Sequence, residues 1–464
     1  MSKAEIISRR GPHKVTPEED KAFEQELTQE AANKAKLKDM MKKKAEKKAP
    51  KAVEKEEKME MVEVVEKQDR ALEWFVVGCG QGGSRVAEAF YNNGYDAVAL
   101  NTAEQDLKYI KLPENNKLLI RYALDGAAKD LVLGEEAFTS NAPDIDKWVR
   151  GKLPDPTHMI ILAVTGGGGT GSGGAYTMID ILRQYGFPVS VLYIMPLESD
   201  DITSKNNSLI TLSKLAKLAK QDVINSLIVV DNAKIETLPY LKQGNFWAEA
   251  NKLIVDPLHK FNALSVCPSN YTSLDPMDTG KLLTTGDCTI YGHLSVSDYM
   301  EELSLAEAII DSLESGLLAS GFDIKTARAV GVIVLGDKEV LDEIPAVNIN
   351  YAFDTLNELT NNATIFKGIY EADTEGAIKI YTLFSGLGLP RERIEKLKEE
   401  AAKGMEAQQK KDDNRATTME MDYNTDNVKN DVKKIHEKIK RQRSAFGKLT
   451  QNAKGGGIID RRKR

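Results

Sequence analysis

Cysteine and histidine are scarce in this chain of 464 residues, which has three of the former and five of the latter. Cys79, Cys267 and Cys288 are far apart and form no CxxC pair, which argues against a disulfide framework and against a cysteine-based zinc site. The histidines show no spacing typical of metal ligands. The sequence therefore predicts no metal site built from cysteine or histidine.

Long apolar runs are also missing. No segment approaches the roughly 20 apolar residues that a membrane-spanning helix needs, and the N-terminus lacks the hydrophobic core of a secretory signal. The formal net charge of −7 argues against a protein that coats nucleic acid over its whole surface. Together these absences predict a cytoplasmic protein without stable membrane insertion.

Composition separates an N-terminal extension from a folded domain. Residues 1–70 are rich in Lys, Glu and Ala, which predicts a charged helical or disordered segment. Residues 71–245 alternate short apolar runs, such as WFVVGCG and HMIILAVTG, with helical stretches. Buried parallel strands have this character because helices cover both faces of their sheet. The fold class predicted for this part is therefore α/β with a doubly wound parallel sheet.

Three further parts follow. Residues 246–288 predict a long central helix, kinked or broken at Pro257, followed by a loop around 270–280. Residues 289–388 mix helices with strands, which predicts a smaller α+β domain with an antiparallel or mixed sheet. Residues 389–464 predict a charged helical or disordered C-terminal tail.

The first of two glycine-rich loops is GCGQGGSR, Gly78 to Arg85, between a predicted strand and a predicted helix. Glycines there let backbone N–H groups approach phosphate oxygens, and the helix N-terminus adds partial positive charge. The spacing of Gly78, Gly80 and Gly83 also fits the Rossmann GxGxxG pattern, which is a weak signal. A tight turn without a ligand remains an alternative for this loop.

The second loop, VTGGGGTGSGGA from Val164 to Ala175, is more specific. So many glycines destabilise an ordinary turn, and a cradle of N–H donors around phosphates offsets that cost. Thr170 and Ser172 add hydroxyls as donors or cation ligands. A flexible linker is disfavoured because linkers do not lie inside a βαβ unit. No Gly-Lys-Ser/Thr closes the loop, so it is not a Walker A motif and lacks its phosphate lysine.

The segment GGGGTGSG resembles the signature G-G-G-T-G-[ST]-G of the tubulin/FtsZ superfamily, and the resemblance extends over Glu73–Gly386. SLIVVDNAKI and SGLGLPRERIEKL resemble the TubZ branch, which plasmids and phages encode. The resemblance implies binding of GTP or GDP with Mg²⁺, and GTP hydrolysis activated by head-to-tail polymerisation. It also implies filaments that partition or position plasmid or phage DNA.

The resemblance further implies which residues bind the nucleotide. Asn101 would approach the γ-phosphate and magnesium, although Ala103 replaces the Asp of the family, and Asp200 would bind the ribose. Asn232 and Asn251 would bind guanine, since an amide both donates and accepts; helix or loop capping is the alternative for both. Lys252 stands where FtsZ has an Asp. The third loop would be Asp125–Phe138, and the phosphates would contact Gln81, Gly82, Gly83, Ser84, Gly168, Gly169, Thr170 and Gly171.

The catalytic acids implied by the resemblance are Asp275 and Asp278 in SNYTSLDPMDTG, where Ser273 replaces the family's Asn. Two carboxylates can orient a water for attack on a γ-phosphoryl group. A polar turn explains their spacing equally well. Because they follow the central helix, opposite the phosphate loops, they would act on the nucleotide of a neighbouring copy through a heterologous contact.

The tail and the remaining alternatives leave the cellular role open. The basic segment Lys433–Arg443 predicts binding of DNA, an acidic partner or an anionic membrane surface, and a solvated tail is the alternative. A DNA-binding adaptor protein is a candidate partner of the C-terminal tail. A divergent FtsZ-like division protein is a second hypothesis, although the FtsZ partner peptide is not recognisable. A non-polymerising modulator of host filaments is a third. A Rossmann oxidoreductase is disfavoured because it needs an acid where the second strand ends in Asn101.

Overall fold

The computed structural model describes residues 69–122, 125–238, 241–242, 244–297, 299–300, 303–314 and 321–419. The predictions for the N-terminal extension, except its last two residues, and for Lys433–Arg443 lie outside these ranges. None of the helices within the described ranges combines the length and the hydropathy needed to cross a bilayer.

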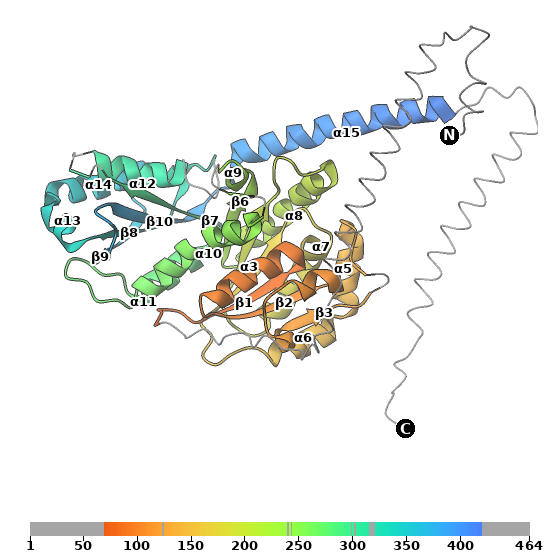
Figure 1. Cartoon of the computed structure of the whole chain (residues 1–464), viewed down its shortest axis with the longest axis horizontal. Coiled ribbons are helices and arrows are strands. Elements are labelled where there is room, and N and C mark those ends of the chain that lie inside the picture. The colour runs from red at the N-terminus through yellow and green to blue at the C-terminus, as the bar shows by residue number, and fades with distance from the viewer. Residues whose placement is uncertain are drawn as a thin grey trace, which may run out of the picture. The chain divides into compact units, whose positions relative to one another are not determined.

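A sheet of ten strands runs through the described part of the chain, in the order β3-β2-β1-β4-β5-β6-β7-β10-β8-β9 (Figure 1). Its first six strands are mutually parallel, which confirms the predicted parallel sheet. These strands are β1 (Trp74–Cys79), β2 (Asp96–Asn101), β3 (Lys117–Leu119), β4 (Met159–Thr165), β5 (Val189–Met195) and β6 (Ser226–Asp231).

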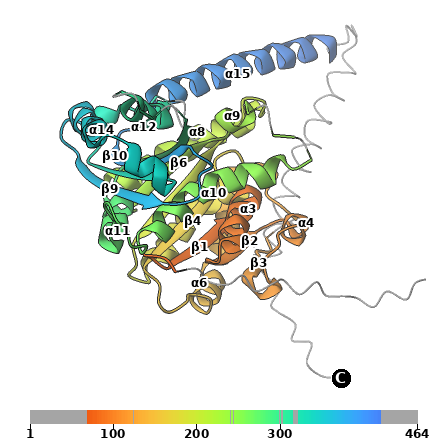
Figure 2. The same cartoon turned by 60° about the vertical axis from the view of Figure 1, so that its left-hand side comes forward.

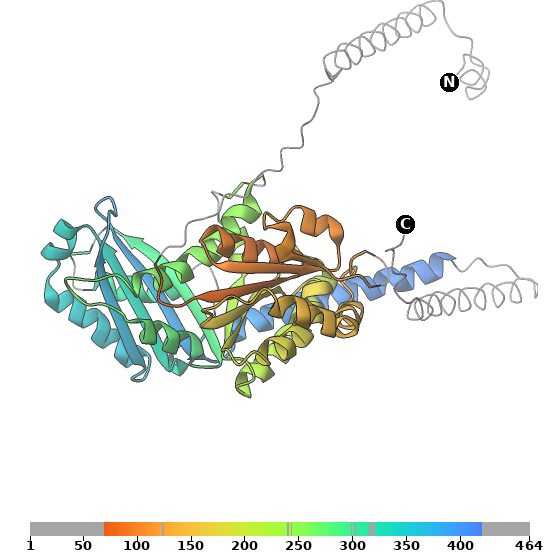
Figure 3. The same cartoon turned by 90° about the horizontal axis from the view of Figure 1, so that it is seen from below.

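Helices cover both faces of the parallel strands (Figure 3). Alternate residues of β1 enter different cores, since Val76 packs with Phe90 whereas Val77 packs with Met178. This arrangement confirms the doubly wound fold. One face carries α3 (Gly80–Asn92), α4 (Glu104–Lys108), α9 (Asn232–Glu236) and α10 (Phe246–Leu264), and the other carries α5 (Leu131–Ser140), α6 (Ala142–Arg150), α7 (Thr170–Arg183) and α8 (Ile202–Lys220).

The C-terminal strands extend this sheet rather than forming a separate one. β7 (Cys288–Val296) pairs in parallel with β6 through its first two residues, and antiparallel with β10 (Ile378–Leu387). The sheet is therefore mixed here, as predicted. The remaining strands and α-helices of the described ranges are β8 (Ala329–Gly336), β9 (Thr364–Glu371), α11 (Pro276–Thr284), α12 (Ser304–Glu314), the short α13 (Lys338–Glu343), α14 (Ala346–Leu359) and α15 (Arg391–Met419).

Two local features differ from what the sequence predicts. Of the kink or break expected at Pro257, the break is wrong, because α10 is continuous through this proline (Figure 2). Its buried face, with Val255, Leu258 and Phe261, outweighs the roughly 3 kcal/mol that an internal proline costs. The predicted loop around 270–280 also contains the start of α11, where Pro276 takes the first helical position, at which its missing N–H costs nothing.

Candidate nucleotide site

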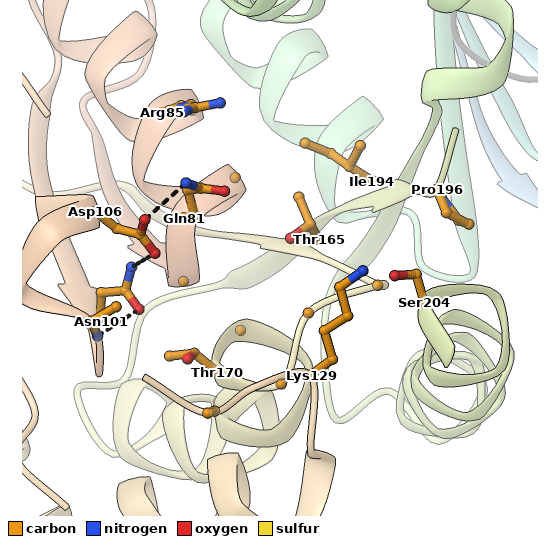
Figure 4. A pocket seen from close by; sticks show the side chains of 18 of the residues that line it. Gln81, Arg85, Asn101, Asp106, Lys129, Thr165, Thr170, Ile194, Pro196 and Ser204 are labelled. Carbon is orange, nitrogen blue, oxygen red and sulfur yellow. Dashed lines mark hydrogen bonds between the residues drawn. The ribbon is translucent and has the colours of Figure 1, made fainter. Parts of the chain in front are cut away.

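A cavity of about 490 Å³ opens at the carboxyl edge of the parallel strands (Figure 4). Doubly wound sheets bind ligands at this edge, and the volume suits a nucleotide. Apart from Gly83, Ser84 and Ser172, every residue named above as a nucleotide contact lines it, namely Gln81, Gly82, Asn101, Gly168, Gly169, Thr170, Gly171, Asp200, Asn232 and Asn251. The Ser172 hydroxyl instead donates to the carbonyl oxygens of Thr165 and Gly166, both at 2.8 Å.

The two glycine loops lock together at the floor of the cavity. A Cβ at Gly80 would lie 2.8 Å from the backbone nitrogen of Gly171, and a Cβ at Gly171 would lie 2.6 Å from the carbonyl oxygen of Cys79. Any larger residue would separate the loops. Because α3 begins at Gly80 and α7 at Thr170, the first turns of two helices present N–H groups and partial positive charge to the cavity. This floor suits an anion.

Gly83 and Ser84 are not brought to the cavity. Gly83 closes the first turn of α3, where it faces the sheet, and Ser84 is the next residue of this helix. A Cβ at Gly83 would lie 2.2 Å from the carbonyl oxygen of Ala163 in β4. The Ser84 side chain is fully buried, and its hydroxyl has no hydrogen-bond partner among the described residues.

Asp106, which the sequence did not single out, organises one wall of the cavity. Its Oδ1 accepts a 2.8 Å bond from Gln81 Nε2, and its Oδ2 accepts a 3.1 Å bond from Asn101 Nδ2. Asn101 Oδ1 in turn accepts from the N–H of Thr102, whose hydroxyl lies 2.6 Å from that of Thr170. The signal in the sequence that could have identified Asp106 is an acidic residue in the first turn of the helix that follows a strand.

The same wall fits magnesium. Its oxygen atoms come from the Asp106 carboxylate, the Asn101 amide and the Thr170 hydroxyl, which are the hard donors that Mg²⁺ prefers. The described residues contain no cluster of three or more His, Cys, Asp or Glu that could hold a metal ion. Magnesium would therefore depend on phosphate oxygens as well, and it would neutralise their charge.

Another part of the cavity combines amides with an aromatic ring. Asn251 and Trp247 lie one turn apart on α10, and both line the cavity together with Asn232. The guanidinium of Arg85 lies 5.5 Å from the centre of the Trp247 ring. Asp200 accepts a 2.9 Å bond from the N–H of Leu197. The amides can pair with a purine and the ring can stack on it.

Asp275 and Asp278 lie away from this cavity. Each accepts a hydrogen bond from the other's backbone N–H, at 2.9 and 3.1 Å, and so they form a capping box at the start of α11. Trp247 near the start of α10 lines the cavity, whereas α11 follows the other end of that helix (Figure 1). Nineteen helical residues span about 28 Å, so the acids do not reach the cavity of their own protomer.

Comparison with known proteins shows which family the chain belongs to. Residues 73–238 match the GTPase domain of the tubulin/FtsZ family, and residues 260–398 match the C-terminal domain of TubZ-like proteins. The chain is 30% identical over 325 residues to the tubulin-like protein CetZ of Pyrococcus abyssi, covering 67% of this chain and 85% of that protein. The chain belongs to the tubulin/FtsZ family.

The chain is also similar to TubZ and to solved protofilament structures of this family. It is 25% identical over 442 residues to TubZ of Bacillus thuringiensis subsp. israelensis, covering 84% of this chain and 87% of that protein. A GTPγS-form protofilament structure of TubZ from serovar israelensis superposes with a TM-score of 0.67 at 22% identity, over 76% of this chain and 96% of the other. A GTPγS-bound protofilament of CetZ2 from Haloferax volcanii gives 0.61 at 21% identity, over 73% and 100%.

These findings confirm the resemblance to the TubZ branch and the predicted chemistry class. As a tubulin/FtsZ-family member, the protein is a GTPase, and its nucleotides are GTP and GDP with Mg²⁺. The roles of individual residues, the filament and its cargo are argued below.

Proposed function

We propose that this GTPase assembles head to tail into filaments and that it hydrolyses GTP at the contact between two protomers. The observation that carries the proposal is the separation of the acids at α11 from the nucleotide cavity. The cavity's own carboxylates, Asp106 and Asp200, already accept hydrogen bonds from neighbouring groups. A second copy that places its Asp275 and Asp278 over the cavity would supply the missing acids.

Within one protomer, different residues of the cavity bind different parts of the nucleotide. The phosphates lie on the two interlocked loops, at Gln81, Gly82 and Gly168 to Gly171, with magnesium at Asn101 and Asp106. Asp200 binds the ribose. Asn232 and Asn251 pair with guanine, because amides match both its donors and its acceptor. The capping role of these asparagines is not supported, since neither caps a helix by its side chain.

The capping box determines how the catalytic assignment is tested. Asp275→Ala removes the N-cap of α11, which costs about 1 kcal/mol by itself. Asp275→Asn keeps an equivalent cap and removes the charge. We expect Asp275→Asn to assemble with GTP, to release phosphate at least about 100-fold more slowly, and to fail to disassemble. Light scattering and phosphate release would be followed together, with Thr285→Ser beyond the helix as the control.

A result in which Asp275→Asn hydrolyses GTP at the wild-type rate contradicts the assignment. Scattering that is absent with GTP and magnesium would instead favour a modulator that does not polymerise.

We propose further that the filament positions DNA in the cytoplasm, as plasmid or phage partition requires. The TubZ-like C-terminal domain and the TubZ relative support this role. The charged C-terminal tail is the candidate contact for a DNA-binding adaptor. The test is a plasmid-loss assay, in which the gene and its flanking DNA are placed on an unstable replicon. Retention of the replicon that Asp275→Asn abolishes supports partition.

A cytoskeletal role without DNA cargo is the second candidate. The higher identity to CetZ, 30% against 25% for TubZ, supports it, as does 25% identity to cell division protein FtsZ 1 of Pyrococcus horikoshii. Unchanged plasmid loss combined with altered cell shape or division would favour this candidate.

A further inference from the structure

The cavity carries little positive charge for a ligand as anionic as a nucleoside triphosphate. Among the described residues that line it, the basic side chains are Arg85 and Lys129. Arg85 lies over the Trp247 ring, at the end with the asparagine amides. Lys129 lies in the third loop, and its side chain reaches across the cavity toward Ser204 (Figure 4).

The loop that carries Lys129 packs directly on the second glycine loop. A Cβ at Gly169 would lie 2.8 Å from the nitrogen of Asp130 and 2.9 Å from the Cβ of Ala127. Asn207 of α8 donates from Nδ2 to the carbonyl oxygen of Lys129 at 2.7 Å and to that of Gly167 at 3.4 Å. The side-chain amide of Asn207 thus holds the third loop against the second glycine loop.

The backbone of the third loop is strained where it carries Lys129. Ala128 and Lys129 have φ values of 48° and 62°, in the left-handed region that residues with a Cβ rarely adopt. Such strain persists only where the surroundings impose it. Asn207 provides one anchor, and Asp130 provides another by capping α5 through the N–H groups of Val132 and Leu133.

The present partner of Lys129 is replaceable. Its ammonium pairs with Asp201, and the two side chains are 46% and 53% exposed. Exposed pairs of this kind contribute little to stability. The lysine lowers the pKa of Asp201, and the N–H of Ser204 does so to a smaller extent. Asp201 also caps α8 through its other oxygen, which accepts from Ser204 at 2.9 Å, so the cap does not require the lysine.

We propose that Lys129 is the phosphate-binding cation of this site and that it exchanges Asp201 for the terminal phosphate of GTP. This inference rests on the nucleotide placement proposed above. With GDP the lysine stays on Asp201; with GTP it moves to the γ-phosphate, because a phosphate offers more charge and more acceptors than one carboxylate.

The experiment compares affinities for GTPγS and GDP in a fluorescence titration at fixed magnesium. Lys129→Ala should lower the GTPγS affinity by about tenfold or more and change the GDP affinity by less than about twofold. Lys129→Gly removes the same charge without straining the left-handed backbone, and the two variants should agree. Lys129→Arg should retain most of the preference for GTPγS.

Asp201→Asn keeps the cap of α8 and removes the competing charge, so it should raise the GTPγS affinity by about twofold. Lys108→Ala is the matched control, because Lys108 forms a similarly exposed pair with Glu104 at 57% and 47% exposure and does not line the cavity. An unchanged ratio of GTPγS to GDP affinity in Lys129→Ala and Lys129→Gly would overturn the inference alone. A wild-type chain that binds neither nucleotide would overturn the proposed function as well.

Discussion

Arg393 of α15 donates from Nε to Oδ2 of Asp231 at 2.6 Å, across 162 positions of sequence. Both side chains are buried, and Asp231 directly precedes Asn232 of the nucleotide cavity. The guanidinium also donates to the carbonyl oxygen of Pro196 at 3.4 Å. Burial raises the pKa of Asp231, and Arg393 opposes that rise. The C-terminal helix is thereby tied to the wall that we assign to guanine.

Arg393→Met tests how far this pair stabilises the fold. The methionine keeps most of the volume but leaves the Asp231 carboxylate buried without its partner. We expect a loss of about 3–5 kcal/mol in the free energy of unfolding, measured in urea. Adding Asp231→Asn should recover part of that loss. Lys398→Met, an exposed position on the same helix, should stay within about 0.5 kcal/mol, and an equal loss there would contradict the role of the pair.

Gly168 and Gly169 offer a matched pair of substitutions in the second glycine loop. A Cβ at Gly168 meets nothing within 4 Å, whereas one at Gly169 would lie 2.7 Å from the carbonyl oxygen of Asp130. Gly168→Ala should therefore fold normally, within about 0.5 kcal/mol, and bind GTP at least about tenfold more weakly because the methyl occupies phosphate space. Gly169→Ala should lose about 1–3 kcal/mol of stability by overpacking.

Nucleotide titration and urea unfolding on the same samples check both variants. Wild-type affinity in Gly168→Ala would show that the phosphates do not lie on this loop.

Local patterns predicted much of the fold because the decisive interactions are local. The runs that became β1, β2, β4, β5 and β6 are apolar on both faces, as buried parallel strands must be. The glycine loops lie between strands and helices, as predicted.

The sequence did not predict the places of several site residues, because these depend on where helices begin and on what packs against them. Ser84 is buried within α3, because that helix begins at Gly80 and takes in a residue that the sequence placed in the loop. Asp106 and Lys129 acquire their places only when the loops meet. Asp275 and Asp278 are different, since Asp at the N-cap, Pro at the first helical position and Asp two residues later are a helix-start signature visible in the sequence.

Trp247 should report and strengthen nucleotide binding. Its side chain lines the cavity one turn before Asn251, and the residue is 40% exposed. If guanine stacks on the indole, Trp247→Ala should weaken GTP and GDP equally, by about tenfold, since the ring contacts the base and not the phosphates. Trp247→Phe should keep much of the affinity. A variant that loses GTP but not GDP would place Trp247 away from the base.

His259 should make the fold sensitive to mild acid. It lies buried on α10, with Nδ1 3.2 Å from the hydroxyl of Tyr95 and the two rings edge to face. Burial, with smaller effects of Lys260 and Arg70, lowers the pKa of His259 to about 4. The ordinary value is about 6.5, so in the window between the two the unfolded chain takes up a proton that the folded chain does not.

Stability from this residue is thus fully present above about pH 6.5 and falls as the pH drops toward 4, by up to about 3 kcal/mol. His259→Gln removes the titrating group. Urea unfolding of both proteins between about pH 7 and pH 4.5 should give a variant whose stability falls less steeply with acid than that of the wild type. Parallel curves would show that the imidazole accepts its proton in the folded chain as readily as in the unfolded one.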